Sequence, residues 1–167
     1  MRVDFRAICG ASGVLGEQGL KTCLAPAVSL SADRIETSAG YHTLDLAAIE
    51  GRCGHTLRRH VGLTDAALVD RALRTHHDVS CFNDTTTAQQ TVDRAFAENQ
   101  GRIGDWVGAH RRANLDLHVH FDRAIGRVFR YDTAVFQAAR DADVILERNP
   151  TMEQGFTVIT AYPSAKC

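Results

Sequence analysis

The sequence predicts an α+β fold in which helices come first and an antiparallel sheet follows. Apolar residues recur at helical spacing between residues 43 and 112. From Leu115 onward the pattern changes to an alternation of apolar and polar residues, which is typical of strands. Hydrophobic residues make up 44% of the chain, which is enough for a real core. A run of helices followed by a run of strands is the order that α+β proteins show.

The first three helices are expected from residue 43 onward. Residues 43–50 can begin an ordered helix, and a short helix over 54–61 stops at Gly62, a residue suited to a helix C-terminus. Thr64 is then the N-cap of the next helix, with Asp65 in its first turn. That helix has one apolar face, formed by Leu68, Val69, Ala72 and Leu73.

Two further helices and the strands complete the prediction. One helix begins near residues 83–85 and the next covers about 101–112. Their apolar stripes are Ala88, Val92, Ala95 and Phe96, then Ile103, Trp106 and Val107 with His110. The alternating segment that begins at Leu115 is a strand with one wet face. Further strands are expected near residues 125–131, 143–148 and 156–162.

The chain of 167 residues suits one domain with an extension. Residues 1–45 are rich in Gly, Ala and Ser without a sustained period, so we expect an N-terminal extension or linker, with the domain over 46–167. No apolar run approaches the roughly 20 residues of a membrane helix, and Asp4 and Arg6 interrupt any signal-peptide core. The five cysteines are widely spaced, which favours buried or incidental thiols over a zinc site; a disulfide framework stays open.

The charge distribution limits how this chain can bind an anion. Its formal net charge is -1, so a nucleic-acid site would have to be a focused cleft instead of a broad basic face. The only lysines are Lys21 and Lys166, and every fixed cation between them is an arginine. A phosphate site in that region would therefore use guanidinium, which binds phosphate through a planar fork.

The segment 54–62 holds two candidate histidines. Five residues along a regular helix turn about 500°, so the rings of His55 and His60 would point about 140° apart and would not share a site. His60 lies in the last helical turn, where the helix dipole favours its imidazolium. The turn at Gly62 can return Arg71 of the next helix toward His60. A structural histidine and an exposed arginine are the alternative interpretations.

The last predicted strand changes character along its length. In a regular strand, residues 156, 158, 160 and 162 share one face, which is apolar at Phe156 and Val158 and carries hydroxyls at Thr160 and Tyr162. Such a face can form the wall of a cleft; a strand end emerging into solvent is the alternative. Pro163 ends the ladder.

A second constellation lies on the strand that begins at Leu115. His118 and His120 share a face and could bind a metal together with Asp116 or Asp122. We prefer a solvated polar face, because no complete ligand set with supporting partners can be named. The pair His76-His77 in an expected loop is a weaker signal.

Several segments resemble a known family, the bacterial RNase A-like toxin domain at the C-terminus of contact-dependent growth inhibition proteins and other polymorphic toxins. The resemblance covers about residues 50–164 and is carried by five short stretches. They are Gly54-His55-Thr56-Leu57 with His60-Val61-Gly62, Thr64-Asp65 with Leu68, Ser80-Cys81-Phe82 with Ile103 and Trp106, Ile125-Gly126-Arg127, and Ile159-Thr160-Ala161-Tyr162-Pro163.

The resemblance implies a kidney-shaped RNase A-type fold and RNA cleavage without a metal or other cofactor. It implies functional positions at His60, Arg71, Thr160 and Tyr162, and a cognate immunity protein as partner. His55 is a candidate second histidine if its segment is not a regular helix. We also expect a delivered effector that acts in the cytoplasm of a target cell, with neither DNA nor a membrane as a partner.

The expected reaction is attack of the RNA 2′-hydroxyl on the adjacent phosphorus, which leaves a 2′,3′-cyclic phosphate. His60 is the candidate base or acid, Arg71 would neutralise phosphoryl oxygens, and Thr160 would donate to the phosphate or hold the imidazole. Tyr162 would supply a proton or stack on a base. Two alternatives remain, a metal-dependent hydrolase or nuclease built on His118 and His120, and a non-catalytic binding module.

Overall fold

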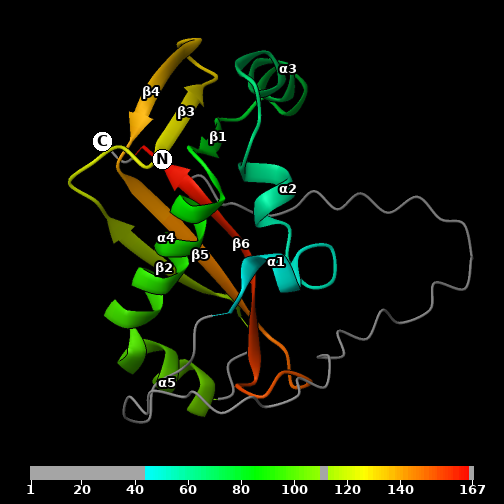
Figure 1. Ribbon diagram of the computed structural model, residues 1–167, viewed down its shortest axis with the longest axis vertical. Helices are drawn as coiled ribbons and strands as arrows, with labels where there is room; N and C mark the ends of the chain where they lie inside the picture. Colours follow the sequence, from blue (N-terminus) through cyan, green and yellow to red (C-terminus); the bar gives the residue numbers. More distant parts are fainter. Residues whose placement is uncertain (1–43, 110–112, 166–167) are drawn as a thin grey trace, which may run out of the picture.

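The expected order of helices and then strands is found with one interruption. The computed structural model describes residues 44–109 and 113–165, and the α+β class is confirmed (Figure 1). The helices are α1 (Leu46–Ile49), α2 (Thr56–His60), α3 (Asp65–Thr75), α4 (Thr85–Glu98) and α5 (Gln100–Gly108). The strands are β1 (Val79–Phe82), β2 (Leu115–His120), β3 (Gly126–Arg130), β4 (Val135–Ala139), β5 (Asp141–Arg148) and β6 (Phe156–Ser164). The interruption is β1, because it lies between α3 and α4, where the sequence predicts no strand.

Three helices begin at side-chain caps. The Asp45 carboxylate accepts the first-turn N–H of α1 at 2.8 Å, and the Thr64 hydroxyl accepts that of α3 at 3.2 Å. At α4 the Asp84 carboxylate accepts from Thr87 at 2.6 Å. The starts of α3 and α4 therefore lie where the capping residues of the sequence predict them.

Helix α2 is capped from outside its own segment. Both carboxylate oxygens of Glu50 accept backbone N–H groups of its first turn, from Leu57 at 2.8 Å and from Arg58 at 3.2 Å. The helix ends at His60, and Gly62 follows with φ +72, a left-handed conformation that glycine adopts at little cost. This short, fixed helix positions the segment that carries His60.

The strands form two antiparallel sheets of three strands, in the orders β1-β3-β4 and β2-β5-β6. The strands predicted near 125–131, 143–148 and 156–162 correspond to β3, β5 and β6. The pattern did not predict β4, whose residues are mostly exposed and show no alternation of apolar and polar types. Antiparallel pairing with β3 supplies the backbone hydrogen bonds that make it a strand.

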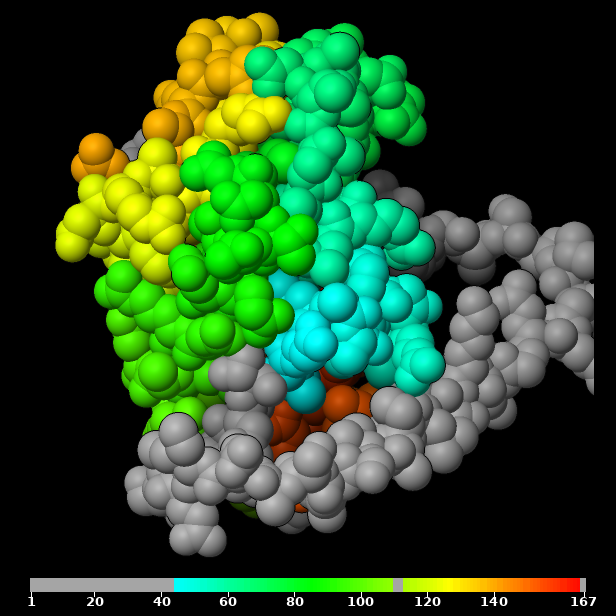
Figure 2. Space-filling model, in the orientation of Figure 1, coloured from blue at the N-terminus to red at the C-terminus, as the bar shows by residue number. Residues whose placement is uncertain are grey.

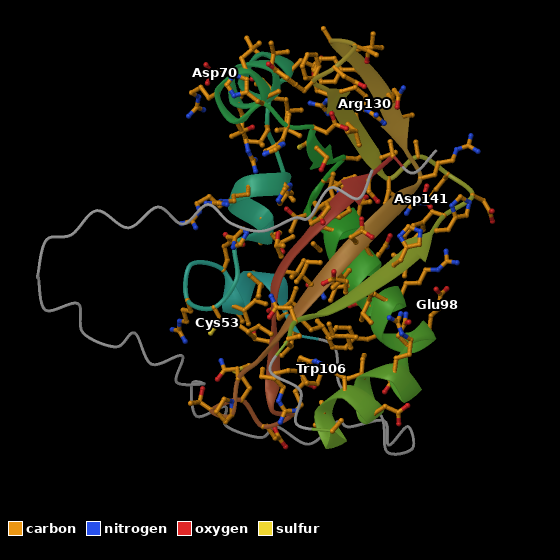
Figure 3. All side chains as sticks on the ribbon, turned by 180° about the vertical axis from the view of Figure 1, so that it is seen from behind. Cys53, Asp70, Glu98, Trp106, Arg130 and Asp141 are labelled. Carbon is orange, nitrogen blue, oxygen red and sulfur yellow. The ribbon has the colours of Figure 1, made fainter. Side chains whose placement is uncertain are left out.

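Helix α4 covers one face of the β2-β5-β6 sheet, and no helix of the described residues covers the other face, which we call the open face. Figures 1 and 3, which view the molecule from opposite sides, show α4 in front of this sheet and then behind it. In Figure 2, α4 and the segment of α1 and α2 lie over the covered face, and part of the orange and red chain remains visible below α1. Helix α3 instead packs on the β1-β3-β4 sheet at the other end of the molecule.

The hydrophobic core is likewise divided between the two sheets. The larger cluster lies between α4, α5 and the β2-β5-β6 sheet and includes Phe96, Trp106 and Phe156. A smaller cluster joins α3 to β1 and β3 through Leu68, Cys81 and Phe129. The two parts meet at Gly126 of β3, where an added Cβ would collide with the Cys81 carbonyl oxygen and with the ring of Pro163 from β6.

Other expectations have mixed outcomes. Residues 1–43 lie outside the described residues, so the extension over 1–45 stays a prediction. The helix expected over about 101–112 is shorter than predicted, because α5 ends at Gly108 with Ala109 as its C-cap; residues 110–112, with His110, lie outside the described residues. The expectation of incidental thiols is wrong for Cys53, which is disulfide-bonded, whereas Cys81 is free and buried. Within residues 44–109 and 113–165, no helix combines the length and apolarity needed to cross a membrane.

Candidate active site

A cavity of about 680 Å³ lies where α2, α3, β1 and β6 converge. It is lined by all five site residues that the sequence singled out, namely His55, His60, Arg71, Thr160 and Tyr162. It is also lined by His76, His77, Asp78, Val79, Ser80, Arg130, Tyr131 and Asp132. Segments about a hundred residues apart in the sequence thus contribute to one concave site of the size that small ligands occupy.

His60 is fixed at this cavity by burial and by a backbone hydrogen bond. Its exposed fraction is 9%, and its Nδ1 lies 3.2 Å from the carbonyl oxygen of Ser80 in β1. A carbonyl oxygen only accepts, so Nδ1 carries the hydrogen and donates it. The neutral ring is therefore the Nδ1–H tautomer, with Nε2 as the nitrogen that can take a proton.

The surroundings of His60 favour its neutral form. Its pKa is lowered from the usual 6.5 to about 4 in total: burial is the main cause, the bond to Ser80 acts in the opposite direction, and the Arg71 guanidinium adds to the lowering. The ring is therefore unprotonated near neutral pH and is able to act as a base. A bound phosphate would offset the arginine charge and make protonation of this ring easier.

His55 lies at the same cavity, contrary to the expectation from helix geometry. It is the N-cap residue of α2, with φ -148, so the 140° separation that holds inside a regular helix does not apply. Its backbone N–H donates to the carbonyl oxygen of Ile159 in β6 at 2.9 Å. Burial lowers the pKa of His55, with a further lowering from the Arg59 guanidinium.

Arg71 reaches the cavity from the middle of α3, as the turn at Gly62 predicted. Its Nη1 donates to the backbone carbonyl oxygen of Arg59 in α2 at 2.7 Å, which ties α3 to α2. Burial and the nearby Arg59 lower its pKa. A guanidinium nevertheless stays charged in proteins, so this end of the cavity carries a fixed positive charge.

Thr160 and Tyr162 face the cavity because β6 contains a bulge. Ile145 of β5 pairs with Thr160, but the next residue, Leu146, pairs with Val158, so Ile159 has no opposite residue. An extra residue reverses the side-chain alternation beyond it. The prediction that residues 156, 158, 160 and 162 share a face is therefore wrong. Phe156 and Val158 are fully buried in the core, whereas Thr160 and Tyr162 lie on the other face.

Both side chains retain hydrogen-bonding capacity. Among the described residues, the Thr160 Oγ1 atom is buried without a hydrogen-bond partner, which is uncommon for a buried hydroxyl. The Tyr162 ring lies 5.5 Å from the His60 ring, centroid to centroid, with 36° between the planes. Burial, together with the carboxylates of Asp143 and Asp116, raises the pKa of Tyr162, so its phenol keeps its proton at neutral pH.

A buried hydrogen bond sets the distance between the two halves of the site. The backbone N–H of Ala161, between Thr160 and Tyr162, donates to the Thr56 hydroxyl at 2.8 Å. Thr56 is 1% exposed and begins α2, the helix that ends at His60. The bond therefore joins the histidine segment directly to the hydroxyl-bearing part of β6.

His118 and His120 do not line the cavity. They lie on the open face of the β2-β5-β6 sheet, opposite Asp143 and Asp141 of β5, the second of which is labelled in Figure 3. His118 bonds Asp143 through Nδ1 at 3.1 Å and Asp141 through Nε2 at 3.3 Å, and His120 bonds Asp141 at 2.8 Å. In the part of the chain that the structure describes, no group of three or more His, Cys, Asp or Glu side chains is arranged to hold a metal ion.

Sequence reasoning missed two parts of the cavity. Ser80 contributes through its backbone carbonyl, a group that every residue has and that no sequence motif reveals. The other missed part is formed by Asp78, Arg130 and Tyr131, with His76 and His77. The adjacent residues His76 and His77 were the one sequence signal for this part of the cavity. Tyr131, which lines the cavity with them, is more than fifty residues away in the sequence.

The comparisons with known proteins agree with this geometry. No curated protein matches the chain. Among solved structures, the chain is similar to the CdiA-CT/CdiI complex from Y. kristensenii 33638, with a TM-score of 0.64 and 29% sequence identity over 67% of this chain and 100% of that one. The family model described as the bacterial CdiA-CT RNAse A domain matches residues 54–163, which include every site residue named above. This chain therefore belongs to the family of bacterial CdiA-CT RNase A domains, the family that its sequence motifs indicated.

Proposed function

We propose that this protein is a metal-independent endoribonuclease toxin that cleaves RNA by transphosphorylation. One observation carries the proposal: a base of fixed tautomer, a guanidinium, a buried hydroxyl and a protonated phenol line one cavity. These are the groups needed to take a proton, stabilise charge on a phosphoryl group and return a proton.

In the first half of the reaction, His60 acts as the base. Its Nε2 takes the proton of a ribose 2′-hydroxyl, and the 2′-oxygen forms a bond to the adjacent phosphorus. The neutral ring is ready for this role at pH 7, because burial holds its pKa near 4 in the free protein. The Nδ1 bond to Ser80 keeps the ring orientation fixed during the transfer.

Arg71 and Thr160 stabilise the charge that develops on the phosphoryl oxygens. Arg71 already lies at the cavity with its Nη1 held by the Arg59 carbonyl oxygen. Thr160 offers a hydroxyl whose hydrogen-bonding needs are unmet in the unliganded protein. Donors of this kind, placed before the substrate arrives, each contribute on the order of 3 kcal/mol to transition-state stabilisation.

In the second half, the bond between phosphorus and the 5′-oxygen breaks, and Tyr162 protonates the departing oxygen. The phenol is suited to this role because burial and nearby carboxylates keep it protonated. The products are a 2′,3′-cyclic phosphate and a 5′-hydroxyl. Proton return from the imidazolium to the phenolate through water restores the site. His55, which lines the same cavity, is the second candidate for the acid.

Membership of the family supports a proposal for the partner and the place of action. The related solved structure is named as a CdiA-CT/CdiI complex, and we propose that a cognate immunity protein likewise binds this chain. We propose further that the domain is delivered to a target cell and acts in its cytoplasm. RNA is then the substrate, and neither DNA nor a membrane is needed as a partner.

The decisive experiment combines purified protein with total RNA, with and without a strong chelator. We expect cleavage in both samples and fragments that end in a 2′,3′-cyclic phosphate. A folded His60→Ala variant should lose cleavage by about 10²–10⁴-fold, the contribution of general acid–base catalysis. Cleavage that requires a metal, or that persists in His60→Ala, contradicts the proposal.

A further inference from the structure

The cavity has a second end that the mechanism does not use. The groups in the mechanism come from α2, α3, β1 and β6. The opposite end is formed by the turn after α3 and by the hairpin between β3 and β4, and includes His76, Asp78, Arg130, Tyr131 and Asp132. Figure 3 labels Arg130 there, beside the α3 end of the molecule.

Tyr131 presents an aromatic ring at this second end. Three large apolar or aromatic side chains are exposed in the described residues, Leu73, Tyr131 and Val135, with exposed fractions of 60%, 37% and 51%. Tyr131 alone of these three lines the cavity. An exposed aromatic ring at the wall of a ligand cavity is a surface on which a flat apolar group can bind.

The ring is held in place before any ligand arrives. Asp78 accepts the Tyr131 backbone N–H at 2.8 Å through one carboxylate oxygen, and its other oxygen lies 2.9 Å from the Arg130 Nε in an ion pair. The His76 ring packs against the Tyr131 ring at 5.4 Å with 85° between the planes. This edge-on contact covers at most one face of each ring. The Tyr131 ring therefore keeps a face on which another planar group can stack.

The charge differs between the two ends. Arg71 lines the catalytic end, and Arg59 is close enough to lower the pKa of His55 and His60. At the second end Arg130 is paired with Asp78 at 2.9 Å and lies 3.7 Å from Asp132. With two carboxylates to one guanidinium, this end does not favour a phosphate. It suits an uncharged planar group instead.

We propose that the end of the cavity formed by Tyr131 and His76 is a subsite for an unpaired nucleobase of the RNA substrate. The inference rests on the proposed function, because it takes the scissile phosphate to lie at the other end. A base linked to that phosphate stacks on the Tyr131 ring, and base–aromatic stacking is worth about 1–3 kcal/mol per base. Stacking needs an open base face, so the substrate at this point is single-stranded.

The test uses short RNA substrates that lack one base beside the cleavage site, on either the 5′ or the 3′ side. We expect the wild-type protein to cleave one of the two abasic substrates with a kcat/KM about 5–150-fold lower than the intact RNA, from the stacking energy. The Tyr131→Ala variant should lose this discrimination, with a ratio near one. Tyr131→Phe should keep it, because the ring face is retained.

Val135→Ala provides the matched control, since Val135 is exposed but does not line the cavity. It should discriminate as the wild type does. The subsite is overturned if the wild-type protein cleaves both abasic substrates as fast as intact RNA. It is equally overturned if Tyr131→Ala, shown folded by its thermal unfolding, discriminates as strongly as the wild type.

A separate measurement distinguishes failure of the subsite from failure of the ribonuclease proposal. Single-stranded RNA with 2′-O-methyl groups has no attacking hydroxyl, so its affinity is measured by fluorescence anisotropy without cleavage. If the protein cleaves no RNA but binds this probe about 5–150-fold more weakly as Tyr131→Ala, the subsite stands and the ribonuclease proposal fails. Equal affinity of wild type and Tyr131→Ala overturns the subsite whatever the activity.

Discussion

His60 at the cavity and the pair His118 and His120 on the open sheet face place the same side chain in opposite environments. His60 is 9% exposed, and its hydrogen-bonding partner is an uncharged backbone carbonyl. The side chains of His118 and His120 are 38% and 61% exposed and bond the carboxylates of β5. A buried ring with a neutral partner stays unprotonated and usable as a base, whereas carboxylates engage the ring nitrogens of the exposed pair.

The two environments also differ in how they arise. The open face follows from strand alternation, because residues of β2 and β5 that share a face come opposite each other. The cavity requires a short helix, a strand far along the chain and a bulge in β6 to meet. Short sequence spacing therefore identified the histidine pair that has no place in the cavity. The functional candidates are brought together by contacts between distant segments.

The largest expected effect separates the two environments by activity. His60→Gln should reduce RNA cleavage by about 10²–10⁴-fold, because glutamine keeps the polar contact but cannot take a proton at neutral pH. His118→Gln and His120→Gln should each stay within a few-fold of the wild type. Initial rates on one RNA substrate give all three values. A loss in the exposed pair equal to that in His60→Gln would reinstate the interpretation in which His118 and His120 do the chemistry.

The second effect concerns stability and pH. The pKa of His60 is about 4 in the folded protein against the usual 6.5, so between these values the unfolded chain binds the additional proton. The free energy of unfolding should therefore fall by roughly 3 kcal/mol in total as the pH falls from about 6.5 to about 4, because the folded state resists protonation of His60. Urea unfolding at about pH 7 and pH 4 should show this loss in the wild type and not in His60→Gln. The exposed His120→Gln variant is the control and should follow the wild type.

A third, smaller effect compares an enclosed polar contact with an open one. Thr56→Val leaves the buried Ala161 N–H without its acceptor, which should cost about 1–3 kcal/mol of unfolding free energy and also lower activity, since this bond joins α2 to β6. Asp70→Asn, in the ion pair with Arg74 whose side chains are 67% and 69% exposed, should cost less than about 0.5 kcal/mol. Urea denaturation measures the free energy of unfolding of both variants. Similar losses in the two would contradict the expectation that the buried contact contributes more than the exposed one.

The smallest effect links the two environments. Asp143 pairs with His118 on one side and with Tyr162 of β6 on the other, and its carboxylate is second to burial among the causes that raise the pKa of Tyr162. In Asp143→Asn the pKa of Tyr162 should fall part of the way toward its usual value, because burial remains. Phenolate absorbance against pH, with Tyr162→Phe subtracted to remove the other tyrosines, measures the change. An unaltered titration would show that the Asp143 carboxylate does not act on the Tyr162 phenol.

Much of the fold could be predicted from local pattern. The starts of α3 and α4 follow from Thr64 and Asp84, whose side chains satisfy the first helical N–H groups. The alternation from Leu115 onward predicted β2 with its buried and exposed faces. Strand β4 could not be found this way, because its exposed residues carry no alternation and pairing with β3 defines it.

The sequence by itself determined the class of fold, the family and the identity of the candidate groups, because capping, periodicity and short motifs act over a few residues. Only the tertiary structure decided which groups meet. The bulge at Ile159 turns Thr160 and Tyr162 out of the core, the non-helical backbone of His55 brings it to the cavity, and the Ser80 carbonyl fixes the tautomer of His60. These features depend on contacts between residues distant in the chain, and no local pattern records them.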